Sequence, residues 1–185
     1  MPRIAPLEPP YPEATQALFD LAMPEGMDPL VLFRVLAQNE RLLPRFMRGG
    51  ILDKGPVPIR DREIVIHRTT ARCGAEYEWG VHVNAFGRPL GLSNAVLAAS
   101  VDGDAEDPAF DERQSVLIRM CDELHDDSTV SDATWAALAT HFDTMQIQDL
   151  IYTAGFYHMV SFLCNGFGLE NEPFGATFEE IRSAQ

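Results

Sequence analysis

The stretch that decides the fold runs from Arg62 to His82 and reads REIVIHRTTARCGAEYEWGVH. Its first half has the spacing of an amphipathic helix, and we expect Asp61 to cap that helix. The Cys73-Gly74 pair should interrupt it, because glycine weakens helix interiors. A second helix is predicted over residues 75–86. The pattern therefore predicts two helices joined by a tight turn.

Outward from this stretch, the same periodicity predicts more helices and no convincing strand. We predict an all-α, single-domain helical bundle, with residues 1–27 as an N-terminal arm carrying a short helix and residues 28–185 as the helical domain. An acidic loop is expected over residues 101–108. The expected helices cover residues 12–22, 28–49 with a bend at Pro44, 94–100 after a Ser93 cap, 110–126, 132–141 after a cap at Ser131 or Asp132, and 145–167.

The helix predicted over residues 145–167 is apolar on almost every side. A helix of that kind must be buried on every side, and one small domain has little material to cover it. We therefore expect a homo-oligomer in which this helix contributes to the interface between subunits.

The charge of the chain narrows the choice of partners. The sequence has 14 Lys and Arg against 28 Asp and Glu, a formal net charge of −14. Phosphate backbones and anionic lipid should repel such a chain, so we expect neither a nucleic acid nor a membrane partner. No secretory signal or membrane span is recognisable, and the three cysteines are widely separated. These features predict a soluble, cytoplasmic protein without a disulfide framework.

The Arg62–His82 stretch also holds the residues most suited to chemistry. Glu78 and His82 are four apart, so a helix would place them on one face, where a carboxylate can orient or charge an imidazole. If the two helices pack antiparallel, Glu63 would reach the same place. Cys73 would lie near the start of the second helix, where the helix dipole lowers a thiol pKa. We predict Glu63, Cys73, Glu78 and His82 as the catalytic residues.

Substrate binding is assigned to three neighbours of this group. Arg68 and Arg72 could hold the carboxylate of an anionic small molecule, and Tyr77 could contact it, although Tyr77 and Trp79 also suit a core. Other structural alternatives remain open: a Glu-x-x-x-His pair often lies on a helix surface, and a cysteine beside glycine is often a small buried residue.

No cofactor and no metal site are expected from the sequence. Glu78 and His82 could be metal ligands, but no cluster of histidines accompanies them. The remaining histidines are isolated in the sequence, and we assign them no role, although His158 stands out because its helix should be buried. They are His67, His125, His141 and His158.

Taken together, these residues resemble the carboxymuconolactone decarboxylase family, which includes the alkylhydroperoxidase D proteins. The resemblance is carried by Arg62-Glu63, by the CGAEYEWGVH segment at 73–82, and by GFYHMVSFLCNGFG at 155–168. It covers roughly residues 28–170. It implies an all-helical fold of antiparallel helices assembled as trimers or hexamers.

The family resemblance implies two kinds of chemistry. Alkylhydroperoxidase D proteins use a glutamate, a Cys-x-x-Cys pair and a histidine, and alignment on Glu63 and His82 puts Ala75 and Glu78 where those two cysteines would be. Cys73 is two residues away from the first of them. The decarboxylase branch lacks the dithiol and is similar to this chain in its Glu-x-x-x-His element.

Three functions therefore compete. The first is a cofactor-free lyase, decarboxylase or isomerase that uses Glu78 and His82 as an acid/base pair on a small carboxylate or lactone, with Glu63 orienting them. The second is a thiol peroxidase with Cys73 as the attacking thiolate. The third is a non-catalytic oligomeric binding protein, because a fold does not fix a function. The missing Cys-x-x-Cys motif favours the first over the second.

Overall fold

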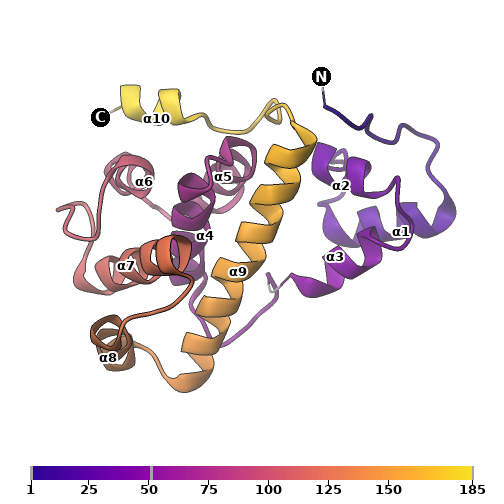
Figure 1. Ribbon diagram of the computed structural model, residues 1–185. Helices are drawn as coiled ribbons and strands as arrows, with labels where there is room; N and C mark the ends of the chain where they lie inside the picture. The colour runs from indigo at the N-terminus through magenta and orange to yellow at the C-terminus, as the bar shows by residue number, and fades with distance from the viewer. Residues whose placement is uncertain (1, 51, 185) are drawn as a thin grey trace.

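The computed structural model describes residues 2–50 and 52–184, and within them the regular structure is helical, as predicted (Figure 1). The helices are α1 (Glu13–Ala22), α2 (Val31–Leu36), α3 (Leu43–Gly49), α4 (Ile59–Arg72), α5 (Glu76–His82), a π-helical turn η1 (Val83–Gly87), α6 (Asn94–Asp102), α7 (Glu112–Asp127), α8 (Asp132–His141), α9 (Thr144–Phe167) and α10 (Phe178–Ser183).

Helices α4 and α9 form the centre of the molecule. Figure 1 shows α9 running diagonally between α4 to α8 on one side and α1 to α3 on the other. Its side chains are buried on both sides: Leu150 and Ala154 belong to the core shared with α4 to α8, while Tyr157 and Val160 belong to the core shared with α1 to α3. The position between two cores thus accounts for the buried part of the apolar composition of this helix.

The turn between α4 and α5 is where the sequence predicted it. Cys73 ends α4, and Gly74 adopts a left-handed conformation with φ of 61°. Glycine tolerates this conformation without the steric cost that other residues meet. The chain then reverses, and α5 packs against α4. This reversal brings the two halves of the Arg62–His82 stretch face to face.

Other element boundaries differ from the prediction. The helix expected from residue 28 is divided into α2 and α3, and Pro44 lies in the first turn of α3, where its missing N–H costs nothing. Asp61 does not cap α4, because the helix already begins after Pro58. Instead Asp61 accepts hydrogen bonds from Arg113 at 3.0 and 2.8 Å. The caps predicted at Ser93 and Ser131 are confirmed by their side-chain hydrogen bonds.

The C-terminal segment covers α5 and depends on a glycine there. The Ala176 N–H donates to the Gly80 carbonyl at 3.1 Å. A Cβ on Gly80 would lie 2.1 Å from the Ala176 oxygen, so no other residue fits without moving the segment. Glu76 also accepts a hydrogen bond from the Phe178 N–H at 2.8 Å. These contacts, and the helix α10 that follows, were not predicted from the sequence.

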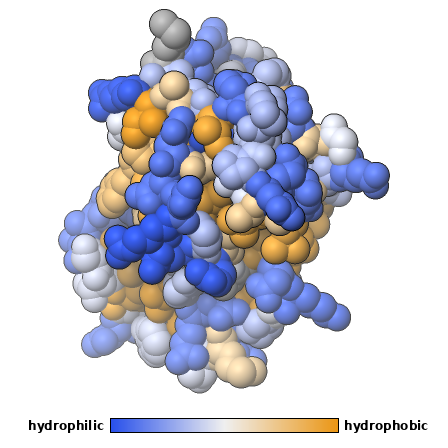
Figure 2. Space-filling view, turned by 90° about the vertical axis from the view of Figure 1, so that its right-hand side faces the viewer, coloured by the Kyte–Doolittle hydropathy of each residue, from blue (hydrophilic) through white to orange (hydrophobic). Residues whose placement is uncertain are grey.

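One face of the molecule is mostly polar. On the face drawn in Figure 2, hydrophilic residues predominate and hydrophobic residues show between them. Among the described residues, no helix combines the length and hydrophobicity needed to cross a membrane.

Several large apolar side chains along α9 are exposed. Phe162 is 68% exposed, and Met145, Tyr152 and Met159 are also exposed. In chain order, from Met145 to Phe162, these four residues are separated by seven, seven and three positions, so they lie on one stripe of the helix. A stripe of this kind is typical of an interface between subunits.

We predict that the chain forms a trimer or a hexamer through this stripe. Phe162→Glu should dissociate the assembly, because the charge would be desolvated in an apolar interface. Leu21→Glu is the matched control, since Leu21 is 84% exposed on α1. Light scattering measures the mass of each variant. A wild-type mass of 20.6 kDa at micromolar concentration, the mass of one chain, would contradict the prediction.

Candidate functional site

The centre of the candidate site is a buried pair of His82 and Glu63. His82 Nδ1 lies 2.8 Å from Glu63 Oε2, and the two side chains are 4% and 0% exposed. Glu63 comes from the middle of α4 and His82 from the last turn of α5. The turn at Gly74 thus places them together, as expected for antiparallel helices.

The other edge of the imidazole faces two more polar groups. His82 Nε2 lies 3.0 Å from the Tyr157 hydroxyl and 3.5 Å from Glu78 Oε1. The Phe86 ring stacks on His82 at 5.1 Å, and the Tyr157 ring stands perpendicular to it at 5.0 Å. The imidazole is therefore fixed in position by contacts at both nitrogens and on its faces.

The two carboxylates decide the protonation of His82. Burial by itself would lower the pKa of His82, but the charge and hydrogen bond of Glu63, with those of Glu78, raise it to about 9. Burial would raise the pKa of Glu63, yet the charge and hydrogen bond of His82 hold it below its usual value. At neutral pH the pair is an imidazolium and a carboxylate.

An arginine approaches the pair from the side of Glu63. Arg62 Nη2 lies 3.4 Å from Glu63 Oε1, and Arg62 Nη1 donates to the Asp53 carbonyl at 3.4 Å. Next to Arg62 is a hollow of about 10 Å³, lined by Asp53, Gly55, Val57, Arg62, Asp149 and Thr153. A volume of this size holds about one water molecule.

Comparison with known proteins identifies the fold of this chain. No family model and no curated protein matches the chain. An uncharacterized peroxidase-related protein from Silicibacter sp. is similar in structure, with a TM-score of 0.79, 22% identity, and 94% of this chain and 93% of that one covered. An uncharacterized peroxidase-related protein from Ralstonia eutropha, described as an alkylhydroperoxidase D core, gives 0.78 and 17%, covering 92% and 93%.

The chain has the alkylhydroperoxidase D-like fold. A protein of unknown function from Agrobacterium tumefaciens is similar at a TM-score of 0.56 and 18% identity, covering 88% of this chain and 92% of that one. The resemblance noted in the sequence is thus matched at the level of the fold.

Within this fold, Cys73 lies apart from the other predicted catalytic residues. Its thiol is 3.9 Å from His125 Nδ1, and no contact with Glu63, Glu78 or His82 is found among the described residues. The cysteine that approaches the His82 group is Cys164, whose Sγ lies 4.0 Å from Glu78 Oε2. The prediction that placed Cys73 in this group is therefore corrected: the turn directs its side chain toward α7.

The predicted substrate-binding arginines are engaged elsewhere. Arg68 donates to both carboxylate oxygens of Asp122, at 2.6 and 2.8 Å. Arg72 donates to Asp126 at 2.5 Å. These pairs join α4 to α7. The arginine next to the His82 group is Arg62, a residue not predicted from the sequence to bind substrate.

Tyr77 also lies away from the His82 group and contacts other parts of the fold. Its hydroxyl donates to Glu172 Oε1 at 2.5 Å and accepts from the Leu32 N–H at 3.0 Å. It therefore ties α5 to α2 and to the C-terminal segment, instead of facing His82. Burial and the charge of Glu172 raise the pKa of its hydroxyl.

Three residues near the pair were not predicted from the sequence. Tyr157 and Cys164 stand in α9, where their apolar neighbours gave no sign of a polar environment. His67 lies one turn after Glu63 and is fully buried, and burial lowers its pKa to about 4, so it is neutral at pH 7. Only the position of His67 four residues after Glu63 could have indicated its place.

A larger hollow lies outside this group. It has a volume of about 460 Å³ between the N-terminal arm, α1 and the loop before α2, and none of the predicted site residues lines it. Its lining lacks the paired carboxylate and imidazole found around His82, so the candidate site remains at His82.

We predict that the ion pair makes stability depend on pH. Because the pKa of His82 is raised from 6.5 to about 9, its contribution is complete below pH 6.5 and is lost as pH rises through about 9. The contribution of Glu63, whose pKa is lowered from 4.5, is complete above pH 4.5 and is lost as pH falls through the lowered pKa of the folded state. Urea unfolding between about pH 2 and pH 10 measures this profile.

Glu63→Gln should remove the partner of His82. Burial then dominates, so the pKa of His82 should fall by NMR titration, and the free energy of unfolding at pH 7 should drop by roughly 3 kcal/mol. Glu106→Gln is the control, since Glu106 pairs with Arg119 on the surface at 2.8 Å and should matter by less than about 1 kcal/mol. Equal stability losses in the two variants would refute the assigned role of the buried pair.

Proposed function

We propose that this protein is a cofactor-free enzyme that transfers protons on a small carboxylate or lactone, as a lyase, decarboxylase or isomerase does. The observation that carries the proposal is the buried imidazole of His82, held by Glu63 at one nitrogen and facing Tyr157 and Glu78 at the other. A charged, oriented imidazole in a water-poor environment suits general acid catalysis.

The proposed roles follow from which nitrogen each group faces. Nδ1–H donates to Glu63, which orients the ring and stabilises its charge. Nε2–H is the proton available for transfer, and Tyr157 holds it in line. Glu78 Oε1, at 3.5 Å from Nε2, is the proposed base that takes up or returns the proton on the substrate side. His82 and Glu78 then end each cycle in their starting protonation states.

The proposed substrate is small and anionic. Arg62 is the cation beside the pair, and the hollow next to it accommodates about one water molecule. A substrate carboxylate at Arg62 would therefore replace water there and require the adjoining 52–58 segment to adjust. The local charge of Arg62 would offset the repulsion expected from a chain of net charge −14.

His82→Gln tests the proposal because it keeps hydrogen-bonding capacity but removes the titratable proton. The assay is deuterium incorporation or loss of carbon dioxide from a panel of small lactones and carboxylic acids in D₂O. We expect kcat to fall by about 100-fold or more, with Glu78→Gln behaving similarly and shifting the pH profile. His141→Gln is the control, since His141 lies at the end of α8. Unchanged turnover in both site variants would overturn the proposal.

A thiol peroxidase is the second candidate, and two observations favour it. Two of the similar structures are described as peroxidase-related, and Cys164 lies 4.0 Å from Glu78. In this reaction the thiolate attacks the peroxide, an alcohol leaves, and an added dithiol reduces the sulfenic acid with release of water. However, burial and the charge of Glu78 raise the pKa of Cys164, which disfavours the thiolate.

We therefore predict weak hydroperoxide reduction that requires an added thiol. Cys164→Ser and Cys73→Ser should each leave proton transfer on the carboxylate panel intact. Mass spectrometry after mild peroxide detects the thiol chemistry. Rapid, reversible oxidation of Cys164 or Cys73, coupled to turnover that the corresponding serine variant abolishes, would favour the peroxidase over the acid–base enzyme.

A further inference from the structure

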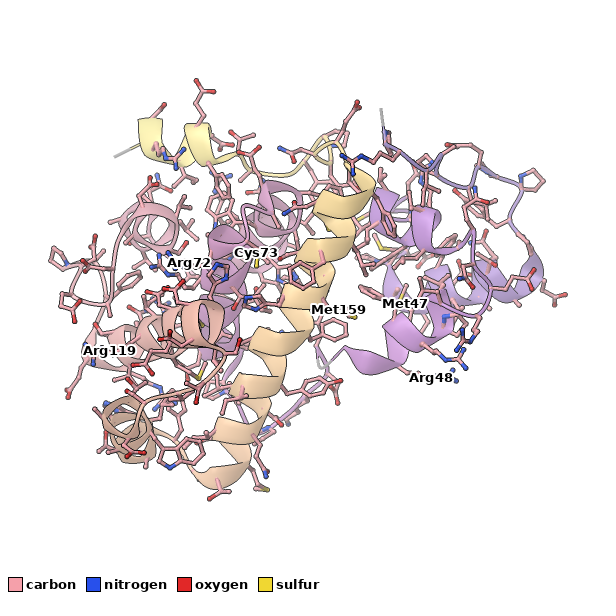
Figure 3. All side chains as sticks on the ribbon, in the orientation of Figure 1. Met47, Arg48, Arg72, Cys73, Arg119 and Met159 are labelled. Atoms are coloured by element: carbon pink, nitrogen blue, oxygen red, sulfur yellow. The ribbon has the colours of Figure 1, made fainter. Side chains whose placement is uncertain are left out.

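Three potential metal ligands lie close together, and none of them belongs to the His82 group. Cys73 ends α4, His125 lies in the last turn of α7, and His158 lies in the middle of α9. All three side chains are half-buried, and their Sγ and ring nitrogen atoms lie within 4.8 Å of one another. Figure 3 shows Cys73 between α4 and α9, beside Arg72.

The distances within this cluster are near those of a tetrahedral site. His125 Nδ1 and His158 Nε2 are 3.0 Å apart, and Cys73 Sγ is 3.9 Å from His125 Nδ1. With zinc bonds of 2.0–2.1 Å to nitrogen and 2.3 Å to sulfur, tetrahedral geometry separates two nitrogens by about 3.3 Å and sulfur from nitrogen by about 3.6 Å. The third pair, Cys73 Sγ and the His158 ring nitrogen, lies within 4.8 Å, so binding an ion would draw these side chains together by up to about 1 Å.

The surroundings already orient two of the ligands. His158 Nδ1 lies 3.0 Å from the Ala154 carbonyl, so Nδ1 carries the proton and Nε2 presents its lone pair to the cluster. A histidine that donates its second nitrogen to a backbone carbonyl is the usual arrangement of a metal ligand. The Asn165 amide donates to the Cys73 carbonyl at 2.8 Å and fixes the turn that carries the thiol.

The protonation states are compatible with this arrangement. Burial lowers the pKa of His125 and the charge of Arg72 lowers it further, while the Asp126 and Asp122 carboxylates act in the opposite direction, so the neutral ring predominates at pH 7. Burial raises the pKa of the Cys73 thiol, opposed by a Ser161 hydrogen bond and by Arg72. An ion would displace the thiol proton on binding, as zinc does in other Cys and His sites.

We propose that Cys73, His125 and His158 form a Zn²⁺ site with a fourth position open to water. The donor set of one thiolate and two imidazoles suits zinc, and three protein ligands leave the fourth position for a water molecule. The site shares no residue with the His82 group, so it does not depend on the function proposed there. It would join the ends of α4 and α7 to α9, and it departs from the expectation of no metal.

The full-length chain, reduced and freed of metal by a chelator, tests the proposal. Titration with Zn²⁺ at pH 7.5 should show one ion per chain and a higher Tm. Co²⁺ used as a probe should give a thiolate-to-cobalt charge-transfer band together with the intense visible bands of a tetrahedral ion. Neither readout involves catalysis.

Variants assign the ligands. Cys73→Ser should abolish the charge-transfer band, and His125→Ala and His158→Ala should each weaken Zn²⁺ binding by roughly 100-fold or more, the upper end of what loss of a supporting contact costs. Cys164→Ser and His141→Ala are matched controls and should bind as the wild type does. Circular dichroism checks that each variant is folded.

Several results would overturn the proposal. The first is that the wild type, with Cys73 reduced, binds no Zn²⁺ at micromolar concentration. The second is a cobalt spectrum that lacks the charge-transfer band. Zn²⁺ binding that survives Cys73→Ser unchanged, or that His82→Gln removes, would also refute it by placing the ion elsewhere. In the first case the histidines at 3.0 Å would be a simple hydrogen-bonded pair.

Discussion

A carboxylate and an imidazolium are buried together where α4 and α5 meet, and much of the fold depends on keeping the two groups in contact. Neither Glu63 nor His82 could be charged there alone, because an unpaired buried charge is very costly. At 2.8 Å each neutralises the other. The antiparallel register of the two helices is therefore constrained, since a shift by one residue would separate the pair and leave both charges without a partner.

Two glycines make that register attainable. Gly74 reverses the chain in a left-handed conformation that other residues rarely adopt. Gly80 allows the backbone at Ala176 to pack directly on α5, which excludes water from that side of the helix. The His82 group thus lies in a low-dielectric environment, where hydrogen bonds and charges act strongly on the pKa of His82.

Helix α9 connects the separate polar clusters of the molecule. Within eight residues of this helix, Tyr157 contacts His82, His158 lies beside Cys73 and His125, and Cys164 approaches Glu78. Successive residues on a helix point about 100° apart, so neighbours such as Tyr157 and His158 reach different sites. The proposed acid–base group and the proposed zinc site are consequently close in the chain but chemically independent.

The sequence by itself determined the helical class, the α4–α5 turn and the Glu63, Glu78 and His82 group, because local periodicity, a glycine and i,i+4 spacing are short-range properties. Only the tertiary structure decided that Cys73 faces α7, that Arg68 and Arg72 bind aspartates, and that Tyr157, Cys164, His125 and His158 join polar clusters. Most of those contacts join residues that are 52 or more positions apart in the sequence. The contact between His125 and His158 joins residues 33 positions apart. Such pairings depend on how helices pack across the core, which the spacing within any one helix does not specify.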